Sequence, residues 1–255
     1  MVTANLQWLL NMTDYKVTSS AFTDVGLKRS ANEDSIYENV LNGMWVVADG
    51  MGGFENGSMA SKTAVEGLAA LDLPEDFESA CDIIAARIYE INSRIYDMSQ
   101  QCGQQMGTTA AVLLIRHGKF AAIWVGDSRV YVYRRGGLFQ LTVDHTHVQD
   151  LVDEGLLSPA DAESHSMSHV LTRALGVEDC VSVDIVNDVL EPGDIFLICS
   201  DGLTGPVDDE QIRWIISDTH PEKASRALLD LCYENGAPDN ISIILVSTKA
   251  EDHVG

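Results

Sequence analysis

Short apolar runs alternate with longer amphipathic stretches along this chain, and the two patterns predict strands and helices respectively. The apolar runs of strand length are Met44–Ala48, Ala110–Ile115, Phe120–Val125, Val130–Tyr133, Ile195–Cys199 and Ile241–Val246. The glycine pair Gly136–Gly137 comes shortly after the fourth run, and we interpret it as the turn of a β-hairpin.

Apolar residues at helical spacing predict two long helices in the first half of the chain, over Ser58–Leu71 and Glu78–Gln101. Two more are predicted near the end, over Asp208–Ser217 and Pro221–Tyr233. The former opens with acidic residues and the latter with proline, and both features are typical of helix starts.

The order of these elements favours an α+β fold. Strands are followed by a helix pair, more strands, an insertion, further strands and two closing helices. This order lacks the regular strand–helix alternation of parallel α/β folds. Two sheets covered by segregated helices fit it better.

Residues 145–170 interrupt the pattern. They predict a short helix over Thr146–Glu154 and the start of another at Ser158-Pro159, where serine caps and proline takes the first position. A polar stretch with His165 and His169 follows. We interpret this insertion as a surface flap that could cover a site.

The length of 255 residues suits one large domain. We expect residues 1–16 to be a loosely attached leader, residues 17–247 the single domain, and residues 248–255 a polar tail. The first residues lack the basic segment of a signal peptide, and no stretch is long and apolar enough to span a membrane.

Acidic residues outnumber basic ones by 39 to 16, which gives a net charge of −23. Such a surface repels nucleic-acid phosphates and concentrates cations. The five cysteines are scattered and include no CxxC pair, which argues against a disulfide framework or a zinc knuckle. We therefore expect a cytoplasmic protein that binds neither nucleic acid nor membrane.

Four of the apolar runs adjoin an aspartate. Asp49, Asp127 and Asp201 each follow a run, and Asp239 precedes one. In an antiparallel sheet the end of one strand lies beside the start of its neighbour, so all four carboxylates could converge at one rim. Oxygen ligands of this kind suit Mg²⁺ or Mn²⁺. Ordinary Asp-Gly turn chemistry is the alternative interpretation.

The segment Thr23–Asp34 combines turn-forming residues with Arg29 and the acidic pair Glu33-Asp34. An arginine placed here could bind an anion next to a metal site. A salt bridge in a surface loop explains the same residues equally well.

Several segments, taken in order, resemble the motifs of the PPM/PP2C family of metal-dependent protein phosphatases, in its compact bacterial form. They are TDVGLKRSANED (23–34), VADGMGG (47–53), GTTAAVLLI (107–115), VGDSRVYVYRRGGLFQLTVDHT (125–146), VLTRALG (170–176), ICSDGLTG (198–205) and PDNISIILV (238–246). The resemblance spans residues 18–246. It implies a four-layer α-β-β-α sandwich, in which helix pairs flank two antiparallel sheets, with a metal centre at one end.

The resemblance also implies a ligand set for two or three Mn²⁺ or Mg²⁺ ions. Asp49 is expected to bridge two metals, and the Gly50 carbonyl to reach one of them directly or through water. Asp201 and Asp239 are expected to bind the second metal, and Asp127 with Asp201 a third.

Further roles come from the same resemblance. Glu33 and Asp34 would orient metal-bound waters, Arg29 would clamp the phosphate, and Asn240 would position the loop that carries Asp239. The implied reaction is hydrolysis of phosphoserine or phosphothreonine by a metal-activated water, without a phospho-enzyme. Cys199 lacks the Cys-x5-Arg loop of cysteine phosphatases.

One position departs from many eukaryotic relatives, which have histidine just after the Asp-Gly pair as a candidate general acid. Met51 stands there in this chain and cannot transfer a proton. The alternatives are a metal-bound water or a flap histidine, of which His165 is our preferred candidate for contact with the substrate.

Three hypotheses remain for the function. The first is an active, monomeric phosphatase acting on phosphorylated proteins, opposing a bacterial Ser/Thr kinase. The second is a catalytically dead member that binds phosphoproteins, but its metal ligands should be degraded and here they are intact. The third is a metal-dependent nuclease or small-molecule phosphatase, and the acidic charge weighs against a nuclease.

Overall fold

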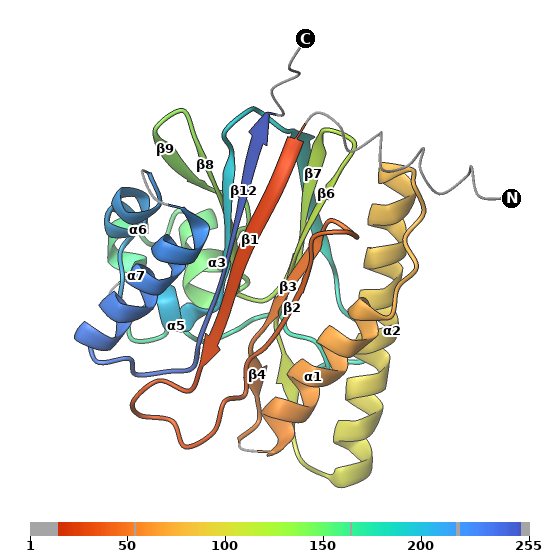
Figure 1. Ribbon diagram of the computed structural model, residues 1–255. Helices are drawn as coiled ribbons and strands as arrows, with labels where there is room; N and C mark the ends of the chain where they lie inside the picture. Colours follow the sequence, from red (N-terminus) through yellow and green to blue (C-terminus); the bar gives the residue numbers. More distant parts are fainter. Residues whose placement is uncertain (1–14, 54, 164, 218–219, 251–255) are drawn as a thin grey trace, which may run out of the picture.

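Two five-stranded antiparallel sheets form the centre of the computed structural model, which describes residues 15–53, 55–163, 165–217 and 220–250 (Figure 1). The first sheet has the order β1-β12-β11-β8-β9, with bounds Tyr15–Asp24, Ile241–Ala250, Ile195–Cys199, Arg129–Arg134 and Gly137–Gln140. The second has the order β10-β7-β6-β3-β2, with bounds Asp184–Val189, Lys119–Val125, Ala110–Arg116, Met44–Ala48 and Ser35–Asn39. A short ladder pairs β4 (Gly50–Met51) with β5 (Gly107–Thr108).

Helices cover the outer faces of both sheets (Figure 1). On the second sheet lie α1 (Glu55–Ala69) and α2 (Phe77–Cys102). On the first lie α6 (Asp209–Ile216), α7 (Pro221–Glu234) and the short α5 (Asp201–Thr204). The layers therefore follow the order helix, sheet, sheet, helix, which confirms the predicted α-β-β-α sandwich.

Side chains of β3 show how one strand serves two cores. Met44 and Val46 pack under α1 and α2, whereas Trp45 and Val47 point into the layer between the sheets. This alternation is the period of two of a β-strand, and the strand is wholly buried because both faces are covered. Between the sheets, the rings of Phe120 and Phe196 lie 4.8 Å apart at an angle of 59°.

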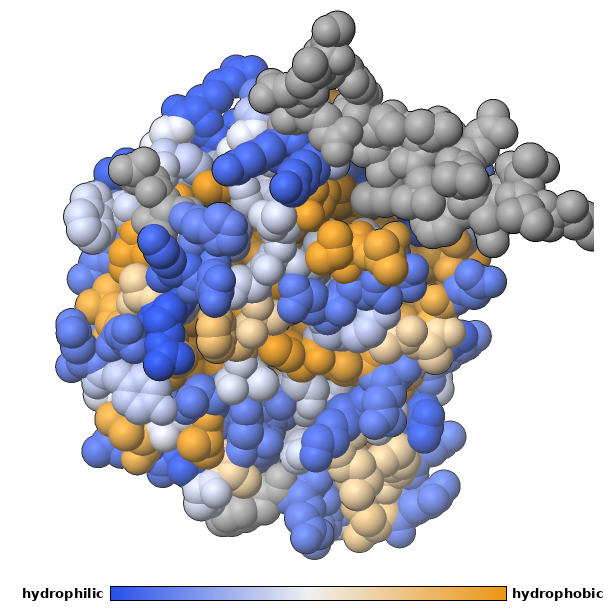
Figure 2. Space-filling model, viewed as in Figure 1, coloured by the Kyte–Doolittle hydropathy of each residue, from blue (hydrophilic) through white to orange (hydrophobic). Residues whose placement is uncertain are grey.

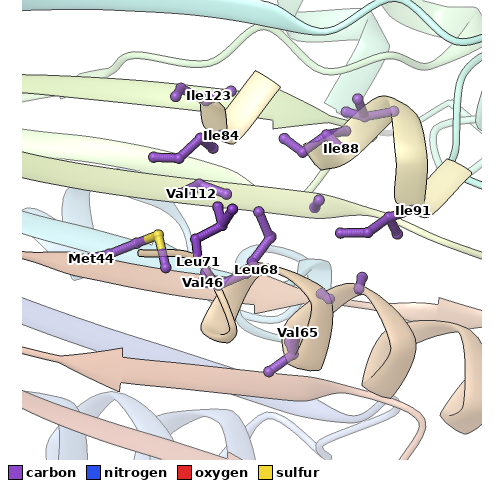
Figure 3. Packing of buried hydrophobic residues seen from close by; sticks show 14 of the residues in the cluster. Met44, Val46, Val65, Leu68, Leu71, Ile84, Ile88, Ile91, Val112 and Ile123 are labelled. Carbon is purple, nitrogen blue, oxygen red and sulfur yellow. The ribbon is translucent and has the colours of Figure 1, made fainter. Parts of the chain in front are cut away.

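The helix α2 is the longest element and is defined at both ends. The Asp76 side chain accepts a hydrogen bond from the backbone N–H of Ser79, and Gly103 ends the helix in the left-handed conformation. Its apolar stripe, which includes Ile84 and Ile88, packs against β6 and β7 (Figure 3). Burial of each such isoleucine contributes roughly 1.5–3 kcal/mol.

The predicted strands and helices are confirmed, with small shifts of their ends. The first helix begins at Glu55 rather than Ser58 and ends at Ala69 rather than Leu71. The hairpin turn consists of Arg135 and Gly136, both with positive φ, while Gly137 already belongs to β9. This is the geometry that a tight two-residue hairpin turn requires.

The predicted ends of the domain need correction. Tyr15 pairs with Ala250, so β1 takes in the last two residues of the predicted leader, and β12 takes in the first three of the predicted tail. Hydrogen bonding between these two strands continues beyond the apolar run on which the prediction depended. Residues 1–14 and 251–255 lie outside the described residues.

The insertion contains the two predicted helices, α3 (His147–Asp153) and α4 (Pro159–Glu163). Thr146 caps α3 with its side-chain oxygen and also pairs with Leu171, so the two ends of the insertion are joined at its base. We keep the name flap for residues 145–170.

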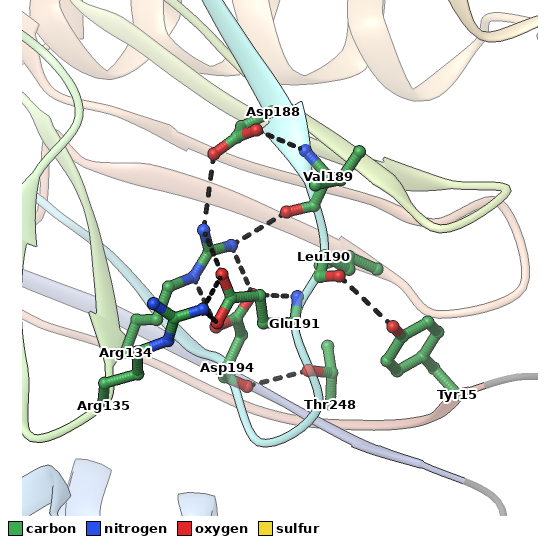
Figure 4. Close-up of polar contacts among 9 residues, drawn as sticks. All are labelled: Tyr15, Arg134, Arg135, Asp188, Val189, Leu190, Glu191, Asp194 and Thr248. Atoms are coloured by element: carbon green, nitrogen blue, oxygen red, sulfur yellow. Dashed lines mark hydrogen bonds and ion pairs between the residues drawn. The ribbon is translucent and has the colours of Figure 1, made fainter.

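A polar cluster ties strands together at the end where β8 turns into β9 (Figure 4). Arg134 donates two hydrogen bonds to the buried carboxylate of Asp194, at 2.9 and 2.7 Å. It also contacts Asp188 and Glu191. Bidentate pairs of this kind are the stronger ion pairs, and this one joins β8 to the turn before β11.

The molecular face in Figure 2 is mainly hydrophilic, with apolar residues visible among the polar ones. Some large apolar side chains are exposed, and the most exposed of these is Trp214 on α6. No helix within the described residues combines the length and apolar character needed to cross a membrane.

Candidate metal centre

The ends of strands from both sheets meet at one rim, which holds Asp49, Asp127, Asp201 and Asp239. The strand β11 is antiparallel to both β8 and β12, so Asp201, which follows it, lies beside the residues that precede those strands. Asp127 links β7 to β8, and Asp239 precedes β12. Asp49 follows β3, which points the same way as β7 because both are antiparallel to β6. The predicted convergence is therefore confirmed.

Threonines of the segment Gly107–Thr109 hold the backbone of Asp49. Its carbonyl oxygen accepts hydrogen bonds from the Thr108 hydroxyl and the Thr109 N–H, both at 2.9 Å. Its own N–H donates to the Thr109 hydroxyl at 2.9 Å. Three hydrogen bonds thus fix the backbone of Asp49 and, with it, the direction of its side chain at the rim.

The adjacent Gly50 lies where the chain has no room for a side chain. A Cβ atom there would be 2.1 Å from the carbonyl oxygen of Gly57 and 2.5 Å from that of Glu33. A Cβ at Gly57 would in turn be 1.9 Å from the Glu33 carboxylate. The Glu33 carboxylate therefore lies against the first turn of α1, where backbone N–H groups favour a negative charge.

Asp127 is 8% exposed and is held from two sides. The Gly126 N–H before it donates to Nδ1 of His145 at 2.9 Å, and the Ser128 hydroxyl after it bonds to the Thr109 hydroxyl at 2.7 Å. The same threonine therefore fixes both Asp49 and the loop of Asp127.

Asp34 lies between the loops that carry Asp201 and Asp239. Its Oδ2 accepts hydrogen bonds from the hydroxyls of Ser200, at 2.8 Å, and Ser242, at 2.7 Å. The Ser200 hydroxyl also accepts the Ser242 N–H at 3.0 Å. These two serines were not predicted, because hydroxyl residues are common and only the pairing of β11 with β12 brings them together.

Asn240 organises the segment that precedes β2. Its side chain donates to the carbonyl oxygens of Val25 and Ala31 and accepts the Glu33 N–H at 2.8 Å. Asn240 therefore holds the Thr23–Asp34 segment against the rim. Its backbone N–H also donates to Oδ1 of its neighbour Asp239 at 2.8 Å. On this segment, the Arg29 guanidinium contacts the Asp239 carboxylate at 2.6 Å.

His169 of the flap contacts a carboxylate of the rim. His169 Nδ1 lies 3.5 Å from the Asp201 carboxylate, and this contact raises the pKa of His169 although partial burial opposes the change. The predicted substrate contact, His165, forms hydrogen bonds with Ala162, Met167 and Ser168, all within the flap. Which flap histidine approaches the rim depends on the path of the loop, which the sequence pattern does not specify.

The rim carboxylates have unusual electrostatics. Burial, together with the charges of neighbouring aspartates, raises the pKa of both Asp34 and Asp127 to about 7. Burial and the charges of four aspartates (Asp34, Asp201, Asp127 and Asp239) hold the pKa of Asp49 well above its usual range. Cations bound at the rim would favour the charged forms of these carboxylates.

Two oxygen atoms provide a further test of whether cations fit. Oδ1 of Asp34 and Oδ1 of Asp201 are buried and lack any hydrogen-bond partner among the described residues. In the same part of the chain, no three His, Cys, Asp or Glu side chains surround one point closely enough to hold an ion unaided. Mg²⁺ commonly uses one or two carboxylates and keeps several waters, so these oxygen donors fit hard divalent cations.

A family model described as protein phosphatase 2C matches residues 28–230. This chain belongs to the protein phosphatase 2C family. It is 35% identical over 240 residues to the serine/threonine protein phosphatase PstP of Mycobacterium tuberculosis, with 92% of this chain and 45% of PstP covered. It is 35% identical over 241 residues to the protein phosphatase PhpP of Streptococcus pneumoniae, with 91% of this chain and 98% of PhpP covered.

The chain thus spans about half the length of PstP and nearly all of PhpP. The solved catalytic domain of PstP in complex with two manganese ions has a TM-score of 0.82 and is 32% identical, with 92% of this chain and 99% of that chain covered. Similarity to this phosphatase structure confirms the predicted family and fold.

Proposed function

We propose that this protein is a phosphatase that hydrolyses phosphoserine and phosphothreonine in proteins, using two or three Mn²⁺ or Mg²⁺ ions. The observation that carries the proposal is the convergence of Asp49, Asp127, Asp201 and Asp239 at one rim, where Asp34 and Asp201 each have a buried oxygen atom without a hydrogen-bond partner among the described residues. Membership of the protein phosphatase 2C family and the manganese ions of PstP support it.

In this proposal the rim residues divide the work of holding the ions. Asp49 would bridge two of them, and the Gly50 carbonyl oxygen would reach one directly or through water. Asp201 and Asp239 would hold the second, and Asp127 with Asp201 a third. Bound there, the ions would supply activation of water and neutralisation of charge on the phosphoryl oxygens.

The remaining residues orient the reactants. Arg29 offers two parallel N–H donors to the phosphate oxygens, once its guanidinium turns from Asp239. Asp34, which Ser200 and Ser242 hold in place, and Glu33 accept hydrogen bonds from ordered waters. Protein groups that are already oriented in this way stabilise the transition state without reorganisation.

The proton donor for the leaving alkoxide is a separate proposal. Met51 has no proton to give, so water or a flap histidine must supply it. His165 was the candidate from the sequence, and His169 is the histidine with a rim contact. Both are therefore tested, with His169 the first choice.

The experiment measures Mn²⁺-dependent hydrolysis of a phosphothreonine peptide beside that of a nucleotide and a sugar phosphate. We expect preference for the peptide and loss of activity in Asp49→Asn. Absence of activity with Mn²⁺ would contradict the proposal, and preference for the small molecules would favour a small-molecule phosphatase.

The cellular setting is also a proposal. We infer that the protein acts in the cytoplasm as a monomer, on the substrates of a Ser/Thr kinase or on the kinase itself. The relatives named as serine/threonine phosphatases and the scattered free cysteines support this inference. Neither nucleic acid nor membrane is an expected partner, because the net charge is −23.

A further inference from the structure

A pocket of about 530 Å³ lies next to the rim, lined by Met51, Gly52, Asn56, Gln104 and Gln105. Its lining residues belong to β4 and the residue after it, to the first turn of α1, and to the segment that follows α2. Its size is within the range of pockets that bind ligands. Nothing in the proposed chemistry at the aspartates uses it.

The pocket is close to Asp49 and hence to the rim where the proposed reaction takes place. Met51 is two residues from Asp49, which places their Cα atoms roughly 7 Å apart in extended chain. The ladder of β4 with β5 pairs Met51 with Gly107, and the next residues of the same segment hold the Asp49 carbonyl. A substrate whose phosphate reaches the rim therefore has its neighbouring atoms beside this pocket.

The walls of the pocket are held together before any ligand arrives. The Asn56 amide donates to Oε1 of Gln104 at 2.8 Å, and the Ser99 hydroxyl donates to the Gln104 carbonyl oxygen at 3.0 Å. Gly52 has a φ of 127°, and a Cβ atom there would be 2.5 Å from the Gln105 carbonyl oxygen. Only glycine permits this approach of the two walls.

The lining of the pocket is polar but carries no charge. Three primary amides line the pocket and none of its lining residues is charged, in a chain with 39 acidic residues. Within the described part of the chain, the Asn56–Gln104 hydrogen bond leaves the Gln105 amide, Nε2 of Gln104 and Oδ1 of Asn56 without a protein partner. The pocket therefore offers both donors and acceptors without charge.

We propose that this pocket binds the main chain of the phosphoprotein segment next to the phosphorylated residue. The inference rests on the proposed function and names how that site would hold its protein substrate. Peptide N–H and C=O groups match the neutral amides, whereas a second phosphate would require cationic donors. Recognition of the main chain tolerates many sequences and gives no help to small phosphomonoesters.

The test compares three substrates with Mn²⁺ present. These are a phosphothreonine peptide, the same peptide N-methylated at one flanking amide after another, and 4-nitrophenyl phosphate. The measured quantity is the ratio of kcat/KM for the peptide to kcat/KM for the aryl phosphate. A double variant, Gln104→Ala with Gln105→Ala, is matched by Gln101→Ala, an exposed glutamine in α2 that does not line the pocket.

We expect the ratio to fall about tenfold in the double variant, as for the loss of one or two hydrogen bonds, and to stay unchanged in Gln101→Ala. N-methylation at one flanking position should lower the wild-type ratio similarly and should have no further effect on the double variant. An unchanged ratio, or N-methylation that weakens both proteins equally, overturns the subsite alone. Hydrolysis of the aryl phosphate without hydrolysis of the peptide overturns the proposed function and the subsite with it.

Discussion

The Arg29 guanidinium lies 2.6 Å from the carboxylate of Asp239 across the rim. Arg29 is more than half exposed, so its side chain is able to turn toward a phosphate. We predict that Arg29→Ala lowers kcat/KM for a phosphopeptide about a hundredfold, equivalent to about 2.7 kcal/mol. Arg29→Lys should recover little, because lysine keeps the charge but loses the two parallel donors.

Kinetics with Mn²⁺ in excess measure this effect, and calorimetry of Mn²⁺ binding is the control. Both variants should retain their metal affinity. Full activity in Arg29→Lys would argue that Arg29 contributes charge alone.

Divalent cations should stabilise the fold in a pH-dependent manner. Asp34 and Asp127 have pKa values of about 7 without metal, so protons compete with cations for them below that pH. We predict that Mn²⁺ raises Tm more at pH 8 than at pH 6. At a concentration a hundred times Kd, the stabilisation is about 2.7 kcal/mol.

Thermal unfolding with Mn²⁺ or EDTA at the two pH values measures this difference. Asp127→Asn should reduce it, since one competing proton is removed. An equal shift of Tm at both pH values would contradict the prediction.

Gly202 should be essential for the spacing of two metal loops. A Cβ atom there would lie 1.8 Å from the Asn240 carbonyl oxygen, so alanine forces the loops of Asp201 and Asp239 apart. We predict that Gly202→Ala weakens Mn²⁺ binding at least about tenfold. The reason is that a displacement of about 1 Å moves ligands out of the required geometry, and such displacements lower reaction rates at active sites by about a hundredfold.

Calorimetric titration with Mn²⁺ tests this, with Gly67→Ala as the matched control. A Cβ at Gly67 meets only the side chain of Ile91 and no backbone atom, and Gly67 is distant in sequence from both metal loops. Unchanged affinity in Gly202→Ala would show that the two loops move independently.

His145 should make stability depend on pH. Its ring is buried, Nδ1 accepts the Gly126 N–H, and Nε2 lies 2.9 Å from the Asp184 carboxylate. Burial lowers the pKa of His145 below 6.5, although the Asp184 contact opposes this. As the pH falls through 6.5 the unfolded chain takes up a proton before the folded protein does, so stability falls.

Urea unfolding between pH 5 and pH 7.5 measures the slope. In His145→Asn, whose amide oxygen is able to accept the Gly126 N–H, the slope should be smaller. The same slope in wild type and variant would assign the effect to other groups.

As general acid, His169 should protonate the leaving alkoxide of a phosphothreonine substrate. We predict that His169→Ala slows hydrolysis of a phosphothreonine peptide about a hundredfold, within the usual range for general acids. The rate for 4-nitrophenyl phosphate should change much less, because nitrophenolate leaves without a proton. His165→Ala is the comparison, and equal losses on both substrates in His169→Ala would exclude the acid role.

The buried strands were predictable and the edge strands were not. The strand β3 is a continuous apolar run because helices cover one face and the other sheet covers the second. At the edge, β10 reads Asp-Ile-Val-Asn-Asp-Val, and its side chains are half-buried or exposed, so no continuous apolar run distinguishes it from a loop.

The same reasoning applies to the rim. The four aspartates were predictable because each adjoins a strand, and strand direction brings the ends together. Ser200 and Ser242 were not, because their contact with Asp34 joins segments distant in sequence. Met51 showed from the sequence that a proton donor was missing at its position. Which flap histidine replaces it depends on the path of the flap, and local sequence patterns do not determine that path.

The pairing of β1 with β12 has a consequence for how the first sheet assembles. Asp239 and β12 follow the other rim aspartates in the sequence, and β12 is the strand between β1 and β11. During synthesis the first sheet stays open until β12 leaves the ribosome, since the strands it joins are far apart in sequence. A nascent chain that still lacks β12 therefore has no complete rim.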